Sequence, residues 1–362
     1  MTRKMMALGA LLALSLAPVG VQAQAQPTPP DAAQARSDDE ARLRPIAPEL
    51  QEAARMALGI SKTMGNIDEK MVLASRKGGG GGMPVPPRLA DVPVAEKMTP
   101  GPKGAPEVKL FVINAKAGTR RPGILHTHGG GYILGTAASD VARLQALARD
   151  LDCVIVTVEY RLAPEATYQD SIEDNYAGLK WMHDKAAEIG LDRSRIALTG
   201  ESAGGGHAAL LAITARDRGE IPILFQALVY PMLDDRTGGA VPVPPHIATL
   251  GWRAPENQYG WRAFLGQQPG TATVPARAVP ARTKTLAGLP PAFIEVGGVD
   301  LFVSEDIDYA RRLNEAGVPT ELLVVPGAFH GFDQLAPDSP QARQFTQAKL
   351  EALRRAFQRK AP

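Results

Sequence analysis

The sequence predicts an α/β fold in which helices cover both faces of a mostly parallel sheet. Past residue 90, short apolar runs alternate with segments of helical period. The runs are apolar throughout rather than at every second position, as expected for parallel strands that are buried on both faces. A glycine-rich turn around Ser202 joins one apolar run directly to a helix-forming run, which is how a parallel strand passes into its crossover helix.

The expected elements follow from these runs. We expect strands at 108–113, 123–128, 153–160, 195–199, 225–230, 291–296 and 321–325. We expect helices at 139–149, 171–188, 202–216, 305–315 and 342–358. The segment 241–285 is rich in proline and aromatic residues and interrupts the alternation. Because it is too long for an ordinary loop, we expect it to contribute a lid insertion.

Residues 1–23 have the features of a signal peptide. Arg3 and Lys4 precede an apolar run, which closes in Val21-Gln22-Ala23, a small-x-small cleavage pattern. The run is interrupted by Pro18 and is shorter than the roughly 20 apolar residues that a membrane helix needs. We therefore expect an exported protein, periplasmic or secreted, with no integral membrane segment after signal removal.

The segments between the signal and the catalytic domain differ in composition. Residues 24–45 are rich in Gln, Ala and Pro, which predicts a disordered leader. Residues 46–83 predict a helical cap segment of two short amphipathic helices, broken near Gly65-Asn66 and followed by the glycine joint 78–82. The α/β catalytic domain is expected at 84–362.

Composition excludes several classes of partner and cofactor. Of 362 residues, 44% are hydrophobic and 22% are charged, which suits one large core. The formal charge of +2 falls to zero without Arg3 and Lys4, and no basic run of the kind that binds phosphates is present. We therefore expect no nucleic-acid partner. Cys153 is the only cysteine, so no internal disulfide forms, and its apolar surroundings predict a buried strand residue.

Ser202 is the candidate nucleophile. It lies in Gly200-Glu201-Ser202-Ala203-Gly204, the G-x-S-x-G pattern, and here it stands between an apolar run and a helix-forming run as that turn requires. Glycines two residues on either side prevent a collision at so tight a turn. At the head of the helix, unpaired N–H groups favour developing negative charge.

A serine nucleophile needs a base, and the base needs an acid that orients it. His330 follows the last expected strand, and Asp300 follows the strand at 291–296 through two glycines. The chain order of serine, acid and histidine is the order found in hydrolases of this fold class. The rival acids are Glu295, expected within its strand, and Glu305 and Asp306, expected in the first turn of a helix.

An oxyanion intermediate also needs N–H donors. His128-Gly129-Gly130-Gly131 follows an expected strand and offers backbone unobstructed by side chains. Gly129 and Gly130, together with the amide of Ala203, are therefore the candidate oxyanion hole. His126, two residues from His128, suggests a metal site, but we expect no metal.

These motifs together resemble the hormone-sensitive-lipase-like bacterial esterases, the α/β-hydrolase fold-3 group. The resemblance covers about residues 88–335 and rests on five motifs in family order: 128–131, 160–165, 200–204, 297–300 and 330–332. It implies an α/β-hydrolase fold, a Ser202–His330–Asp300 triad, no cofactor, and hydrolysis of short-to-medium acyl esters. The family more often has Asp at 201 and Asn-Leu at 206–207, and the glycine run 78–82 lies outside its pattern.

The predicted function is that of a serine carboxylesterase acting on a small-molecule ester. Two other classes remain open at this stage. An amidase or peptidase would use the same three residues, because the pocket selects the leaving group. A non-catalytic binding module would normally have lost one of them.

Overall fold

The computed structural model describes residues 32–64, 67–77, 86–102 and 104–359. The chain divides into two units, residues 1–40 and 41–362. Of the first unit the structure describes 32–40, which form most of helix α1 (Ala32–Leu43). The signal peptide predicted at 1–23 lies outside the described residues.

The prediction of a disordered leader over 24–45 is wrong for its second half, because Ala32–Leu43 is helical. Alanine, arginine and glutamate favour a helix, and Leu43 at its end is buried with Ile46 and Leu50. The average composition of the segment conceals this apolar end. Residues 24–31 lie outside the described part of the chain.

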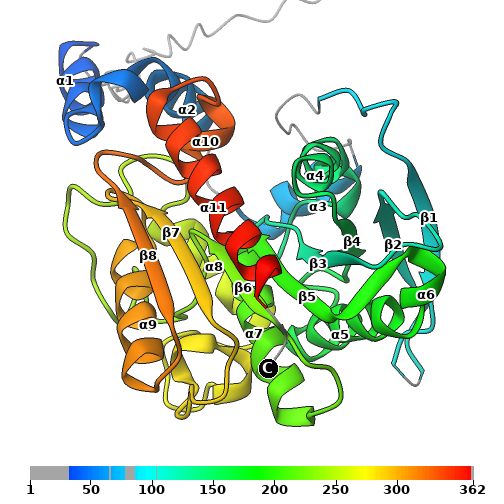
Figure 1. Cartoon of the computed structure of the whole chain (residues 1–362). Coiled ribbons are helices and arrows are strands. Elements are labelled where there is room, and N and C mark those ends of the chain that lie inside the picture. Colours follow the sequence, from blue (N-terminus) through cyan, green and yellow to red (C-terminus); the bar gives the residue numbers. More distant parts are fainter. Residues whose placement is uncertain (1–31, 65–66, 78–85, 103, 360–362) are drawn as a thin grey trace, which may run out of the picture. The chain divides into compact units, whose positions relative to one another are not determined.

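Within the described residues of the second unit, eight strands form one sheet in the order β1-β2-β4-β3-β5-β6-β7-β8 (Figure 1). From β4 to β8 along this order every pairing is parallel, and β1 and β2 add an antiparallel edge. The bounds are β1 Val94–Thr99, β2 Val108–Ile113, β3 Arg121–Thr127, β4 Val154–Glu159, β5 Leu191–Glu201, β6 Phe225–Val229, β7 Ala292–Gly297 and β8 Thr320–Val325.

Helices cover both faces of this sheet. On one face pack α4 (Ala137–Leu151) and α11 (Pro340–Gln358). On the other face pack α5 (Tyr168–Asp184), α6 (Ala186–Ile189), α7 (Ala203–Arg218) and α9 (Val303–Glu315). Alternate strand residues supply the two cores: Phe111 and Ile113 belong to the first, Leu110 and Val112 to the second. The predicted α/β class is confirmed.

All seven predicted strands are present, and β1 is an eighth that the sequence did not reveal. As an edge strand it keeps four of its six residues exposed, so it lacks the continuous apolar run that marked the others. Cys153 lies just before β4 and is buried, as predicted. Burial raises the pKa of its thiol.

The segment 241–285 contains a helix that the sequence pattern does not reveal, α8 (Ala254–Leu265), and two short 3₁₀ turns, η2 (Ala276–Ala278) and η3 (Pro280–Arg282). Trp261 and Phe264 of α8 are buried against Tyr132. The segment was difficult to classify because Pro255 near its start resembles a helix breaker, although proline is favoured in a first helical turn.

The N-terminal helical segment contains a turn η1 (Pro48–Leu50) and helices α2 (Gln51–Met64) and α3 (Glu69–Lys77). The two predicted helices are thus present; the break at Gly65-Asn66 and the joint 78–82 lie outside the described residues. Buried residues of α2 belong to one hydrophobic cluster with residues of the loop after β8 and of α11. No helix among the described residues combines the length and apolarity that crossing a membrane requires.

Candidate functional site

Ser202 occupies a strained turn between β5 and α7. Its backbone angles are φ 58° and ψ −122°, a region that side chains avoid. A Cβ on Gly200 would lie 2.4 Å from the backbone of Gly204, and a Cβ on Gly204 would lie 2.0 Å from the carbonyl of Thr127. Both glycines are therefore required by contact, as the sequence predicts.

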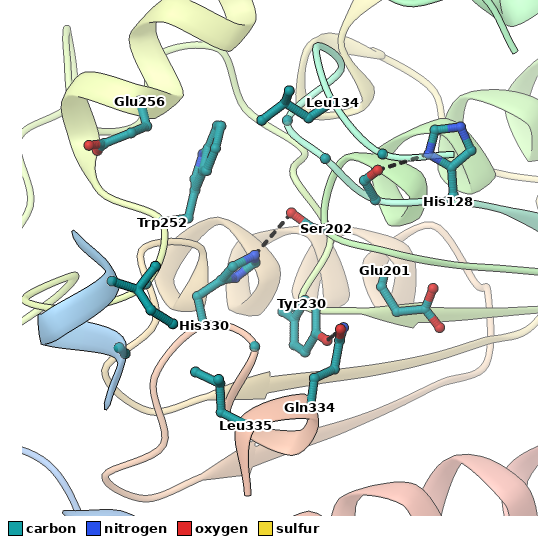
Figure 2. Close-up of a pocket in the computed structure, with 18 of the residues that line it drawn as sticks. His128, Leu134, Glu201, Ser202, Tyr230, Trp252, Glu256, His330, Gln334 and Leu335 are labelled. Atoms are coloured by element: carbon teal, nitrogen blue, oxygen red, sulfur yellow. Dashed lines mark hydrogen bonds between the residues drawn. The ribbon is translucent and has the colours of Figure 1, made fainter. Parts of the chain in front are cut away.

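The hydroxyl of Ser202 is hydrogen-bonded to His330, and His330 is hydrogen-bonded to Asp300. The Oγ–Nε2 distance is 3.0 Å (Figure 2). The Nδ1–Oδ2 distance is 2.7 Å. With Nδ1–H donating to Asp300, Nε2 is left as the acceptor for the serine hydroxyl. The structure therefore brings together the three residues that the sequence singled out.

The sheet topology places these residues. Ser202 follows β5, Asp300 follows β7, and His330 follows β8, so all three lie at the carboxyl ends of parallel strands, where sites of α/β sheets form. Asp300 is fully buried, and its second oxygen accepts the N–H of Phe302 at 3.0 Å. That hydrogen bond fixes the orientation of the Asp300 carboxylate, whose other oxygen is bonded to the imidazole.

Two aromatic rings hold the imidazole at its edges. The ring of Tyr230 lies 4.7 Å from that of His330 and the ring of Phe302 lies 5.2 Å away, both edge-to-face. Sequence reasoning missed both residues. Their positions after the ends of β6 and β7 would have been the signal, because side chains at those ends converge on the same site.

The rival acids do not contact His330. Glu295 lies within β7, and Glu305 accepts the amides of Leu233 and Asp234 at 2.6 and 3.1 Å. Asp306 is buried beside Glu305 and has no hydrogen-bond partner among the described residues. Burial raises the pKa of all three acids well above the usual range, so none of them is suited to hold an imidazolium as a carboxylate.

The glycine loop after β3 passes directly beside the nucleophile. A Cβ on Gly129 would lie 2.8 Å from the carbonyl of Glu201 and 3.6 Å from the Cβ of Ser202. Gly130 has φ +123°, and its Cβ would lie 2.1 Å from the carbonyl of Leu134. Ala203 is buried and begins α7, so its N–H has no partner within the helix. Gly129 thus contacts the Ser202 turn, Ala203 lies on that turn, and Gly130 lines the same cavity as Ser202.

Two buried histidines support this loop. His128 stacks on Tyr160 with ring centroids 4.1 Å apart, and the Tyr160 hydroxyl donates to the His128 carbonyl. His207 lies edge-on to Tyr160 and Tyr132 and has no hydrogen-bond partner among the described residues. Burial lowers the pKa of His128 to about 4 and that of His207 to about 3. Both are therefore neutral at pH 7, and His207 is placed for packing, as predicted.

A cavity of about 470 Å³ opens onto Ser202 and His330. Its walls come from the glycine loop, from Trp252 in the segment 241–285, and from Ile60 and Ile67 of the N-terminal segment. Its volume is in the ordinary range for a small-molecule site. Both segments that the sequence assigned to a cap therefore contribute to its lining.

His126 is fully buried and is not among the residues that line this cavity. Its Nε2 lies 2.9 Å from Oε2 of Glu201, and Asp140 is 4.0 Å away. The three side chains could in principle surround a cation. However, Arg143 and Lys349 already lie 2.6 and 3.6 Å from the same glutamate, and their positive charges disfavour a metal ion there.

Known proteins of the same family share much of this sequence and the same fold. Residues 124–334 match a family described as having the alpha/beta hydrolase fold. Esterase LipI of Mycobacterium tuberculosis is 32% identical over 320 residues, which cover 88% of this chain and 96% of that protein. Carboxylesterase NlhH of the same organism is 35% identical over 283 residues, with coverages of 75% and 86%.

Two solved structures have the same fold over nearly all of their length. Bacterial heroin esterase has a TM-score of 0.77 at 34% identity and covers 88% of this chain and 99% of its own. Esterase LipW from Mycobacterium marinum has a TM-score of 0.71 at 32% identity, with coverages of 88% and 98%.

Proposed function

This chain belongs to the hormone-sensitive-lipase-like group of the α/β-hydrolase fold family and is a carboxylic ester hydrolase. We propose that Ser202, His330 and Asp300 form its catalytic triad and that hydrolysis of the ester proceeds through an acyl-enzyme intermediate on Ser202. The observation that carries this proposal is the pair of hydrogen bonds, 3.0 Å and 2.7 Å long, that joins the three residues.

In the first half-reaction Oγ of Ser202 attacks the ester carbonyl while Nε2 of His330 takes the hydroxyl proton. Asp300 stabilises the imidazolium that forms and remains ionised. The carbonyl oxygen becomes an oxyanion, and the amides of Gly129, Gly130 and Ala203 are the proposed donors to it. His330 then returns its proton to the leaving alcohol, and Ser202 is left acylated.

In the second half-reaction a water molecule takes the place of the alcohol. His330 accepts one of its protons as the oxygen attacks the acyl carbon, a second oxyanion forms in the same place, and its collapse releases the acid and restores the serine hydroxyl. Because both intermediates put their charge beside the start of α7, one set of donors serves both steps.

We further propose short-to-medium acyl chains as the substrate class. The cavity volume of about 470 Å³ and its lining by Ile60, Ile67 and Leu134 support an apolar acyl group of limited length. Chromogenic esters of graded chain length, set beside one matched amide, test this. The proposal of short-to-medium acyl esters would be contradicted if activity were highest on the amide, or if it increased up to the longest acyl chain of the series.

The mechanism is tested by a matched pair of substitutions. Asp300→Asn should lower kcat on a short aryl ester by roughly 10⁴, because the asparagine strands the imidazole in the wrong tautomer, and Ser202→Ala should do at least as much. Asp306→Asn is the control, since Asp306 is equally buried but is not hydrogen-bonded to His330. It should retain most activity. An Asp300→Asn enzyme within tenfold of wild type, with an unchanged melting temperature, would remove Asp300 from the mechanism.

We also propose that the protein is exported and that residues 1–23 are removed. Arg3 and Lys4, the apolar run and the Val21-Gln22-Ala23 pattern support this. N-terminal sequencing of the exported protein should give Gln24 or Gln26 as the first residue. Recovery of an intact Met1 from the membrane fraction would instead indicate a retained anchor.

A further inference from the structure

A buried group of charged side chains lies beside the nucleophile turn, and the mechanism above does not use it. Glu201 immediately precedes Ser202 and is buried, and its carboxylate is directed away from the serine hydroxyl (Figure 2). A buried carboxylate is costly unless basic groups surround it. The structure supplies three such groups, each from a different element.

The first two come from strand β3 and from helix α4, which packs on the sheet. Nε2 of His126 on β3 lies 2.9 Å from Oε2 of Glu201, and the other ring nitrogen of His126 lies 2.8 Å from the hydroxyl of Thr157. Nη1 of Arg143 on α4 lies 2.6 Å from Oε1. Burial alone would raise the pKa of Glu201, but Arg143 and His126 hold it well below its usual value, so this side chain is a carboxylate.

The third basic group is Lys349, which reaches the site from the C-terminal helix. Its side chain is about nine-tenths buried, and Nζ lies 3.6 Å from Oε1 of Glu201. That distance is too long for a strong hydrogen bond, and Arg143 already occupies the same oxygen. Glu201 alone therefore does not explain why a lysine is buried here.

Two further acids account for it. Glu295 on β7 is fully buried, and neither of its oxygens has a hydrogen-bond partner among the described residues. Asp333 of α10 (Phe332–Leu335) accepts the hydroxyl of Tyr230 at 3.0 Å. Burial raises the pKa of both acids, and Lys349 is the largest opposing influence on each. Lys349 is thus a buried cation that lies near Glu201 and whose charge also acts on Glu295 and Asp333.

This cluster is connected to both ends of the catalytic hydrogen bond. Glu201 is covalently joined to Ser202. Asp333, together with Gln334 at 3.2 Å, holds the Tyr230 hydroxyl, and the Tyr230 ring lies against the edge of His330. The backbone N–H of Tyr230 also donates to the carbonyl of Glu295 at 2.6 Å. Helix α11 supports the same ring through Phe345, whose ring stacks 5.9 Å from it.

We propose that Lys349 is a positioning residue for catalysis: its ammonium group balances the buried acids beside the Ser202–His330 pair and keeps that pair aligned. The C-terminal helix is then part of the catalytic apparatus, although it contributes no atom to the reacting groups. The proposal rests on the catalytic role proposed for His330.

The expected sign of the pH effect follows from charge alone. Activity requires neutral His330 as base. Removing the positive charge of Lys349 from its neighbourhood favours the imidazolium, which moves the acidic limb of the pH–rate profile to higher pH. The same change favours protonation of the facing acids, Glu201, Glu295 and Asp333, and their loss of negative charge offsets part of this shift without reversing it; Arg143 remains as the other nearby cation. A unit charge in such surroundings shifts a titration by about one pH unit.

The test compares three variants of one helix by kcat and KM on a short aryl ester between pH 5 and 9, with thermal melts. Lys349→Met should lower kcat about tenfold, leave KM within twofold, and move the acidic limb up by about one pH unit. Lys349→Arg should restore the wild-type profile. Arg355→Met is the control: Arg355 lies on the same helix, but its ion pair with Glu321 is exposed, and neither kcat nor the limb should change.

An acidic limb that stays in place in a folded Lys349→Met enzyme would overturn the proposal. Should that variant fail to fold, Lys349→Gln keeps a polar side chain at the site and should show the same shift. Failure of both to fold would also overturn it, because Lys349 would then serve stability alone. If Asp300→Asn is inactive while the acidic limb of Lys349→Met does not shift, the role proposed for Lys349 is wrong and the proposed function is unaffected.

Discussion

The α/β body and the N-terminal helical segment both line the cavity, but they are held in place by different means. In the body the backbone itself is packed tightly: Gly204 lies against the carbonyls of Thr127 and His128 with no room for a methyl group. In the N-terminal segment, α2 leaves Met56 and Ile60 about half exposed, and a Cβ on Gly59 would meet nothing within 4 Å.

This difference separates two tasks. The Ser202–His330–Asp300 geometry needs its atoms fixed to within a fraction of an ångström, and close backbone packing at strand ends provides that. The segment α2–α3 lines the cavity through side chains such as Ile60 and Ile67, which decide what fits rather than what reacts. Substitutions in the body should therefore affect folding and kcat, and those in the segment should affect KM.

The sharpest test of this contrast is one substitution, glycine to alanine, made in each region. Gly204→Ala places its methyl group 2.0 Å from the Thr127 carbonyl and 2.6 Å from that of His128. Helix α7 must then move away from β3. We expect the unfolding free energy to fall by more than about 3 kcal/mol and esterase activity to be lost. Urea denaturation with activity measured in parallel checks this.

Gly59→Ala is the counterpart in α2. It adds a better helix former where the new methyl group meets nothing, so stability should rise by up to about 1 kcal/mol and kcat should not change. Equal effects of the two substitutions would show that the body is no more tightly constrained than the N-terminal segment.

Low pH should destabilise the α/β body, because protonation of its buried histidines favours the unfolded state. The N-terminal helices 51–77 contain no histidine. Burial lowers the pKa of His207 to about 3, below the 6.5 of an unfolded chain, so the unfolded state binds the proton more tightly. The stability that depends on neutral His207 is complete above pH 6.5 and is lost as the pH falls toward 3.

His207→Leu removes this dependence. Between pH 7 and pH 5 the variant should gain about 2 kcal/mol of unfolding free energy relative to wild type. The buried acids Glu295, Glu305 and Asp306, with raised pKa values, stabilise the fold as the pH falls, but they cancel in the difference between variant and wild type. Phe264→Leu, a change in the same aromatic cluster, should give a constant difference. If the difference in unfolding free energy between His207→Leu and wild type were also independent of pH, protonation of His207 would not carry the expected free-energy cost.

Sequence reasoning worked where local chemistry has a single solution. The parallel strands appear as apolar runs, and Gly200 and Gly204 mark the turn around Ser202 because no other residue fits. The strand ends then made Asp300 and His330 the best candidates, and the structure places the two 2.7 Å apart.

It failed where the decisive contact is distant in the chain. Edge strand β1 pairs with β2 through its backbone and needs no apolar signal. Tyr230 and Lys349 acquire their places only when α10 and α11 return to β6 and β7, more than 100 residues after Tyr230. Nothing local to Lys349 distinguishes it from the exposed basic residues of the same amphipathic helix.

The smallest expected effect lies in the N-terminal segment and concerns Arg76 of α3. Its guanidinium donates to the carbonyls of Ile133, at 2.6 and 3.0 Å, and of Ala163, and it pairs with Glu165. Ile133 follows the glycine loop beside Ser202, so this one side chain ties the segment to the wall of the site. Arg76→Met should release α3 and, with it, Ile67 from the cavity.

Hydrogen bonds from a charged donor, such as those of Arg76 to the carbonyls of Ile133 and Ala163, are worth on the order of 1.5–3 kcal/mol each when fully buried, and partial exposure of Arg76 reduces this. We therefore expect KM for a medium-chain ester to rise about tenfold, while an acetyl ester, too short to reach Ile67, changes less than threefold and kcat is unchanged for both. Steady-state kinetics on the two esters measures this, with Lys70→Met as the control, since Lys70 is an exposed residue of the same helix.

A fall in kcat on the acetyl ester would mean that α3 helps to hold the glycine loop in its reactive position. The division of tasks between the two regions would then fail at this contact, because a side chain of the N-terminal segment would be setting the geometry of the reaction itself.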